Sequence, residues 1–109
     1  MRRSRSSRQR ARCSAGVVVM TCELDLYLPD SRSLKDKRGV LKSLKERIHN
    51  RFSVSVAEVE QNDLWQRAVL GIAVVSSAAD HANEILSKTV NFVEQDLRVQ
   101  LLDYSIEPR

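Results

Sequence analysis

The chain has 109 residues, of which 42% are hydrophobic and 29% are charged. This length and composition suit one globular domain with a single core. No apolar run approaches the roughly 20 residues that a membrane span needs. The apolar stretch Gly16–Met20 is too short for a signal peptide. We therefore expect one cytosolic domain.

The formal net charge of +4 hides an uneven distribution of charge. Residues 1–12 hold six arginines and no acid, so residues 13–109 keep 12 of the 18 basic residues against all 14 acids. Within this part, residues 33–52 carry seven bases and two acids, whereas residues 53–109 carry four bases and nine acids. The predicted domain is thus slightly acidic, and its cations gather in one segment.

Residues 1–16 form an Arg/Ser-rich extension with few apolar side chains. Such a segment buries too little surface to offset the entropy of ordering, which predicts disorder. Two interpretations stay open. The arginines could contact phosphates of a nucleic acid, or a misassigned start codon could precede a protein that begins within Val17–Met20. The abrupt start of the folded pattern there favours the second interpretation.

In chain order, residues 17–28 alternate between apolar and polar side chains, which predicts a strand. Residues 29–32 break it. Residues 33–36 (SLKD) then have the form of a capping box that opens a helix, with Asn50 as a candidate left-handed cap. The apolar residues expected on its buried side are Leu34, Leu41, Leu44, Ile48 and Phe52.

The second half repeats this pattern. Residues 53–60 (SVSVAEVE) predict a strand with a bulge near Ala57, and residues 61–63 supply a turn. Residues 65–75 are apolar on both faces and predict a central strand. Residues 77–80 (SAAD) form a second apparent capping box, for a helix to about Gln95. Residues 98–106 complete the domain as a last strand.

The order β-α-β-β-α-β predicts a ferredoxin-like α+β sandwich spanning residues 17–107. Its four-stranded antiparallel sheet would carry two helices on one face, with the first and third strands central. The other face would be open.

The strongest functional feature is a row of cations on the first helix. Lys35, Arg38, Lys42, Lys45 and His49 fall within an arc of about 80°. Such a row suits a phosphate backbone or an acidic surface. With Arg32 just upstream, the predicted nucleic-acid or anion-binding residues are Arg32, Lys35, Arg38, Lys42 and Lys45. The alternative is a solvated helix face, and residues 31–33 could bind an anion or only cap the helix.

Other candidates are weaker. Trp65 and Arg67 are possible contact residues, although a tryptophan at a strand start is more often an anchor over the sheet edge. On the open face, Glu23 and Asp25 beside Tyr27 argue against a sheet that stacks RNA bases. The two carboxylates lack a third fixed ligand, so we predict no metal site.

No catalytic residue or cofactor is predicted. His49 and His81 have no serine or cysteine at a recognisable spacing, and no glycine-rich phosphate loop occurs. Cys13 and Cys22 form no C-x-x-C motif, which excludes a zinc ribbon or redox dithiol. Cys22 falls on the apolar face of the first strand and should behave as a small hydrophobe.

Four segments carry a family resemblance. They are residues 24–38 (LDLYLPDSRSLKDKR), 41–44 (LKSL), 50–59 (NRFSVSVAEV) and 63–68 (DLWQRA). This pattern resembles the YlxP-like family of small bacterial proteins, catalogued as a domain of unknown function. The resemblance covers about residues 17–107 and excludes the Arg-rich extension. It implies a ferredoxin-like fold and, because family genes often neighbour those of translation and ribosome-maturation factors, a role near the ribosome. The family has no established catalytic residues to carry over.

Three hypotheses follow. The first is a non-enzymatic cytosolic accessory protein that binds RNA or a ribonucleoprotein, such as a ribosomal or ribosome-maturation component, through the basic first helix. The second is a protein-interaction or self-assembly module, for example a homodimer, that uses the open sheet face. The third is an acylphosphatase-like hydrolase using Arg32 and Asn62, which the missing glycine-rich loop disfavours.

Overall fold

Strands and helices alternate as β-α-β-β-α-β in residues 16–60 and 63–109, which the computed structural model describes. The elements are β1 (Val18–Tyr27), α2 (Leu34–Phe52), β2 (Ser55–Glu60), β3 (Arg67–Ser76), α3 (Ala79–Glu94) and β4 (Gln100–Pro108). The predicted order of elements is confirmed. The observed strands β2, β3 and β4 each begin two residues later than predicted.

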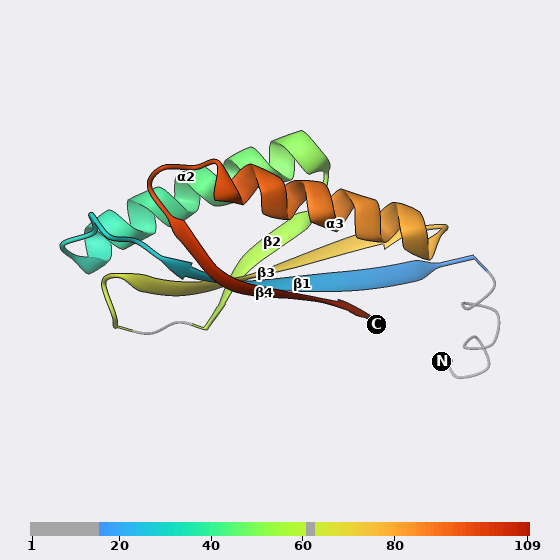
Figure 1. Cartoon of the computed structure of the whole chain (residues 1–109), viewed down its shortest axis with the longest axis horizontal. Helices are drawn as coiled ribbons and strands as arrows, with labels where there is room; N and C mark the ends of the chain where they lie inside the picture. The colour runs from blue at the N-terminus through green and yellow to red at the C-terminus, as the bar shows by residue number, and fades with distance from the viewer. Residues whose placement is uncertain (1–15, 61–62) are drawn as a thin grey trace, which may run out of the picture.

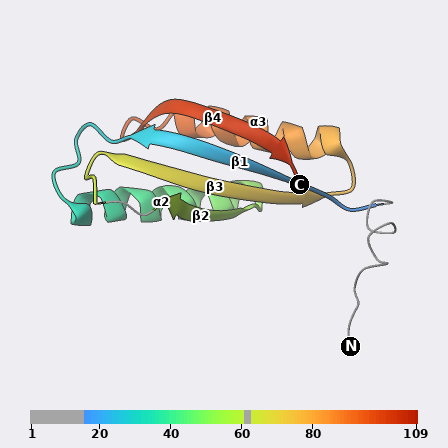
Figure 2. The ribbon, with the colours of Figure 1, turned by 90° about the horizontal axis from the view of Figure 1, so that it is seen from below.

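The four strands form one antiparallel sheet in the order β2-β3-β1-β4. The two longest strands, β1 and β3, occupy the centre, as predicted. They pair along their whole length, with Leu24 opposite Leu70 at the midpoint. The sheet is thus the ferredoxin-like arrangement, seen from its open side in Figure 2.

Both helices cover the same face of the sheet (Figure 1). Helix α3 packs on β1, β3 and β4, whereas α2 packs on β2 and on α3. The sheet's other face has no helix over it in the described part of the chain (Figure 2). One flank of α2 therefore borders α3, and the opposite flank lies beside the edge strand β2.

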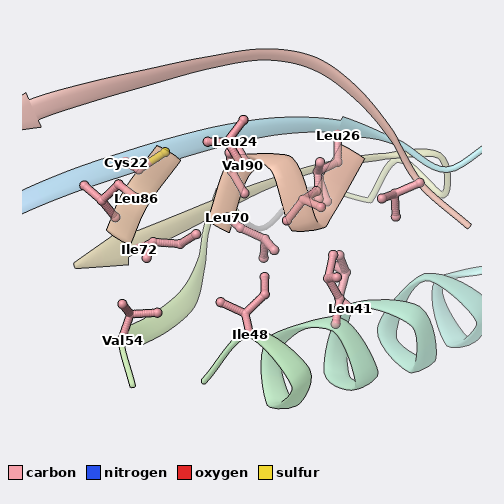
Figure 3. Packing of buried hydrophobic residues seen from close by; sticks show 14 of the residues in the cluster. Cys22, Leu24, Leu26, Leu41, Ile48, Val54, Leu70, Ile72, Leu86 and Val90 are labelled. Atoms are coloured by element: carbon pink, nitrogen blue, oxygen red, sulfur yellow. The ribbon is translucent and has the colours of Figure 1, made fainter. Parts of the chain in front are cut away.

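The core lies between the sheet and the helices (Figure 3). Alternate residues of β1 and β3 point into it, because successive side chains of a strand face opposite sides. Leu24, Leu26 and Leu70 are fully buried, and each contributes about 1.5–3 kcal/mol by leaving water. Cys22 lies in this core, as expected, and burial together with the charge of Glu23 raises the pKa of its thiol to about 11.

The observed caps at the ends of α2 agree only in part with those predicted from the sequence. The capping box at Ser33 is confirmed, because its hydroxyl accepts the backbone N–H of Asp36 at 3.0 Å. Asn50 is not the left-handed cap. That conformation falls on Ser53 (φ 55°), whose N–H donates to the carbonyl of His49.

The second predicted capping box is wrong. Helix α3 begins after Ala78, which makes no side-chain cap, and the hydroxyl of Ser76 accepts the N–H of Ala78 instead. The predicted bulge of β2 exists but lies at Val59, two residues beyond Ala57, because the pairing with β3 shifts between Glu58 and Glu60. Of the predicted turn at residues 61–63, the first two residues lie outside the described part.

Candidate functional site

Four of the five predicted binding cations lie on the flank of α2 that faces away from α3. Lys35, Arg38 and Lys42 are exposed and Lys45 is half-buried. Arg32, exposed at the entrance to the helix, completes the set. We call these residues (Arg32, Lys35, Arg38, Lys42 and Lys45) the basic stripe. His49 continues its line and approaches the carbonyl of Val54 at 2.8 Å, which places the stripe beside the start of β2.

The stripe side chains form no ion pair or hydrogen bond within the part of the chain that the structure describes. Only two acids share the helix, Asp36 and Glu46. One of them is already engaged, because the carboxylate of Asp36 accepts the backbone N–H of Arg32 at 3.0 Å. The positive charge of the stripe is therefore open to an external anion.

On the opposite flank of α2, the cations contact other residues of the fold. Arg47 pairs with Asp96 at 3.2 Å and lies over the ring of Phe92. The guanidinium of Arg51 lies 5.3 Å from the centre of the same ring. Asp96 also binds Arg98, whose hydrogen bonds keep the pKa of this carboxyl below its usual value. These contacts join α2, α3 and the segment between α3 and β4.

Lys37 has a structural position that the sequence interpretation missed. Its side chain is 3% exposed, and Nζ donates to the carbonyls of Leu64 at 2.8 Å and Arg67 at 3.2 Å. The carboxylate of Glu58 lies 4.0 Å away. The signal was present in the sequence, since Lys37 precedes Leu41 by one helical turn in the buried row. The hydrogen bonds of Lys37 hold the first turn of α2 against the segment that leads into β3.

Trp65 precedes β3 and has an exposed side chain. It is 53% exposed, and it lines the rim of a hollow of about 780 Å³ at one end of the open face. Arg67, the other possible contact residue, is held by an ion pair, with Nη2 lying 3.0 Å from each carboxylate oxygen of Asp25. Of these two residues, Trp65 is the one whose side chain faces solvent without a polar partner in the described residues.

The centre of the open face is acidic. Glu23, Asp25, Glu60 and Asp103 border a second, smaller hollow there. Among the described residues, no three His, Cys, Asp or Glu side chains are grouped so as to hold a metal ion. This charge would repel a phosphate backbone laid across the middle of the sheet.

Several sequence predictions fall on residues without a described structure. Asn62, the proposed partner of Arg32 in a hydrolase, lies outside the described residues, as does the Arg-rich extension up to residue 15. His49 and His81 lie on different helices, and His81 contacts Glu84 on its own helix. In residues 16–60 and 63–109, no helix is long and apolar enough to cross a membrane.

Strand order, helix placement and core define a small ferredoxin-like α+β domain. The chain belongs to the YlxP-like family, described as a protein of unknown function (DUF503), whose model matches residues 19–106. It is also 41% identical over 73 residues to the uncharacterized protein YlxP of Bacillus subtilis (strain 168), a match that covers 67% of this chain and 77% of that protein. The resemblance seen in the sequence is thus confirmed.

Proposed function

We propose that this protein binds RNA, free or within a ribonucleoprotein, through the basic stripe of α2. One observation carries the proposal. Helix α2 uses Lys37, Arg47 and Arg51 in contacts within the fold and leaves the stripe cations without partners in the described residues. A fold that needed the stripe only for stability would pair these charges in the same way.

The spacing of the stripe suits a nucleic-acid strand. From Lys35 to Lys45 the helix rises about 15 Å, at 1.5 Å per residue, and one strand presents several phosphates over that length. Lysine and arginine neutralise phosphates and release bound counterions, so the affinity should fall as salt rises. The family relationship adds no activity, since the relative is itself uncharacterized.

Charge reversal tests this proposal. The double variant Lys42→Glu/Lys45→Glu should lose about tenfold in affinity for a fluorescein-labelled RNA at about 0.1 M salt. The control Lys88→Glu/Arg109→Glu makes the same change in net charge with exposed side chains outside the stripe. It should change the affinity less than about twofold. Equal losses in the two variants, or no loss in the first, would reject the stripe as the contact surface.

A second candidate function, self-association through the open face, is favoured by its exposed valines. Val59 is 54% and Val75 69% exposed, and a shallow groove of about 350 Å³ runs beside Val59 and Gly71. Exposed apolar patches often mark contacts between proteins. Sedimentation velocity at two protein concentrations tests this candidate. A self-associating protein should sediment faster at the higher concentration, whereas an unchanged monomer peak would reject self-association.

A further inference from the structure

A hollow lies at the end of the sheet to which Lys37 ties the first turn of α2. It has a volume of about 780 Å³ and forms where β1 ends and β3 and β4 begin. Tyr27, the last residue of β1, pairs with Arg67 on one side and with Gln100 on the other. The remaining lining residues are Asp63, Leu64, Trp65, Gln66 and Leu102.

The lining combines exposed apolar surface with free polar groups. Leu64 is 59%, Trp65 53% and Leu102 45% exposed, a large apolar surface for three neighbours at one site. The side chains of Asp63 and Gln100 make no hydrogen bond or ion pair within the described residues. Hollows in which apolar walls surround a few polar groups are typical of ligand sites.

The hollow is fixed relative to the basic stripe. Lys37 holds the carbonyls of Leu64 and Arg67, and Gln66 donates to the carbonyl of Pro29 at 3.1 Å. Lys37 is the direct neighbour of Arg38, and consecutive Cα atoms are about 3.8 Å apart. One side chain thus joins the helix that carries the stripe to the segment that carries Trp65.

We propose that the hollow holds one unpaired base of a single-stranded RNA, stacked on Trp65, while adjacent phosphates reach the stripe at Lys35 and Arg38. This inference rests on the proposed function. Aromatic side chains bind unpaired bases by stacking, whereas bases within a duplex are already stacked and paired. The strand would pass around the end of the sheet and avoid the acidic centre of the open face.

The polar groups of the hollow suit the edge of a base. Gln100 can both donate and accept hydrogen bonds, and the carboxylate of Asp63 accepts only. A carboxylate recognises the amino group of cytosine, which uracil lacks. We therefore expect oligocytidine to bind more tightly than oligouridine of equal length. Arg67 is already paired with Asp25, so its guanidinium offsets the charge of one acid of the open face.

The test uses the full chain, in which Trp65 is the only tryptophan. The probes are an oligocytidine of about 10 nucleotides and an RNA hairpin with a similar number of phosphates. Oligocytidine should quench the fluorescence of Trp65. Trp65→Ala should weaken oligocytidine binding about tenfold and hairpin binding less than about twofold. Trp65→Phe, which keeps a stacking ring, should retain most of the affinity.

The outcomes separate this inference from the proposed function. If RNA binds through the stripe but leaves the fluorescence of Trp65 and the affinity of Trp65→Ala unchanged, the base site is overturned and the hollow serves another ligand, such as a protein side chain. If neither probe binds the wild-type chain, the proposed function fails and the base site fails with it. The fluorescence measurement needs no variant, so misfolding of Trp65→Ala cannot obscure the result.

Discussion

At the scale of single residues, Lys37 differs from the other lysines of α2 because it is buried. Its Nζ holds the carbonyls of Leu64 and Arg67, and Glu58 lies nearby. Removing one partner of a buried charged contact leaves the others unsatisfied. We expect Lys37→Met to lower the free energy of unfolding by about 2–3 kcal/mol, measured by urea denaturation.

Lys35→Met is the matched control for this prediction. Lys35 lies on the same turn but is exposed, so its loss should change the free energy of unfolding by less than about 0.5 kcal/mol. Two equal effects would show that the contacts of Lys37 do not stabilise the fold.

The lowered pKa of Asp96 predicts that the stability of the fold depends on pH. The hydrogen bond from Arg98 keeps the pKa of Asp96 below its usual value in the folded protein. Because the pKa of Asp96 is lower in the folded protein, its ionised carboxylate stabilises the fold at any pH above the unfolded-state pKa of about 4. This stabilisation is lost as the pH falls through the folded-state pKa. The difference in the free energy of unfolding between wild type and Asp96→Asn should therefore be largest at about pH 7 and become smaller below about pH 4. A gap that stays constant over this range in urea titrations would contradict the assignment.

At the scale of elements, the bulge of β2 lies close against a glycine of β3. A Cβ added to Gly71 would lie 2.5 Å from Cγ1 of Val59, the residue at the bulge. We expect Gly71→Ala to lower the free energy of unfolding by about 1 kcal/mol. Adding Val59→Ala should restore most of that loss, because the clash disappears. A double variant no more stable than the single one in urea would show that Val59 does not oppose the added methyl group.

Period-two patterns and apolar helix faces made the elements predictable from sequence. Each central strand buries alternate residues, so β1 and β3 were placed to within two residues, and the order of elements then determined the sheet. The bulge position and the caps were not predictable in the same way. The bulge lies where Val59 of β2 faces Gly71 of β3, a contact between strands that local spacing does not encode. The N–H of Ala78 donates to the hydroxyl of Ser76, a local contact that the capping-box pattern placed at the wrong residue.

The candidate site was predictable only where it is helical. The stripe follows from helical spacing alone, so its residues could be named from the sequence. The hollow at Trp65 combines the ends of three strands and the segment before β3. Those residues come together only through the sheet pairing, for example of Tyr27 with Gln100. Lys37 was overlooked because a lysine is rarely fully buried.

At the scale of the whole molecule, the described domain is electrically polarised. Residues 33–52, which are Ser33 and the whole of α2, carry seven bases and two acids, whereas residues 53–109 carry four bases and nine acids. Glu23, Asp25, Glu60 and Asp103 lie on the face of the sheet that the helices do not cover. An approaching polyanion should therefore orient the molecule with the flank of α2 toward it.

The salt dependence of RNA binding tests the central claim most directly. The logarithm of the association constant should fall linearly with the logarithm of salt concentration between about 50 and 200 mM. The slope should become shallower by roughly 1.5 to 2 in Lys42→Glu/Lys45→Glu, because two phosphate contacts are lost. It should stay at the wild-type value in Lys88→Glu/Arg109→Glu. Identical slopes in all three proteins would contradict the claim that the basic stripe contacts the phosphates.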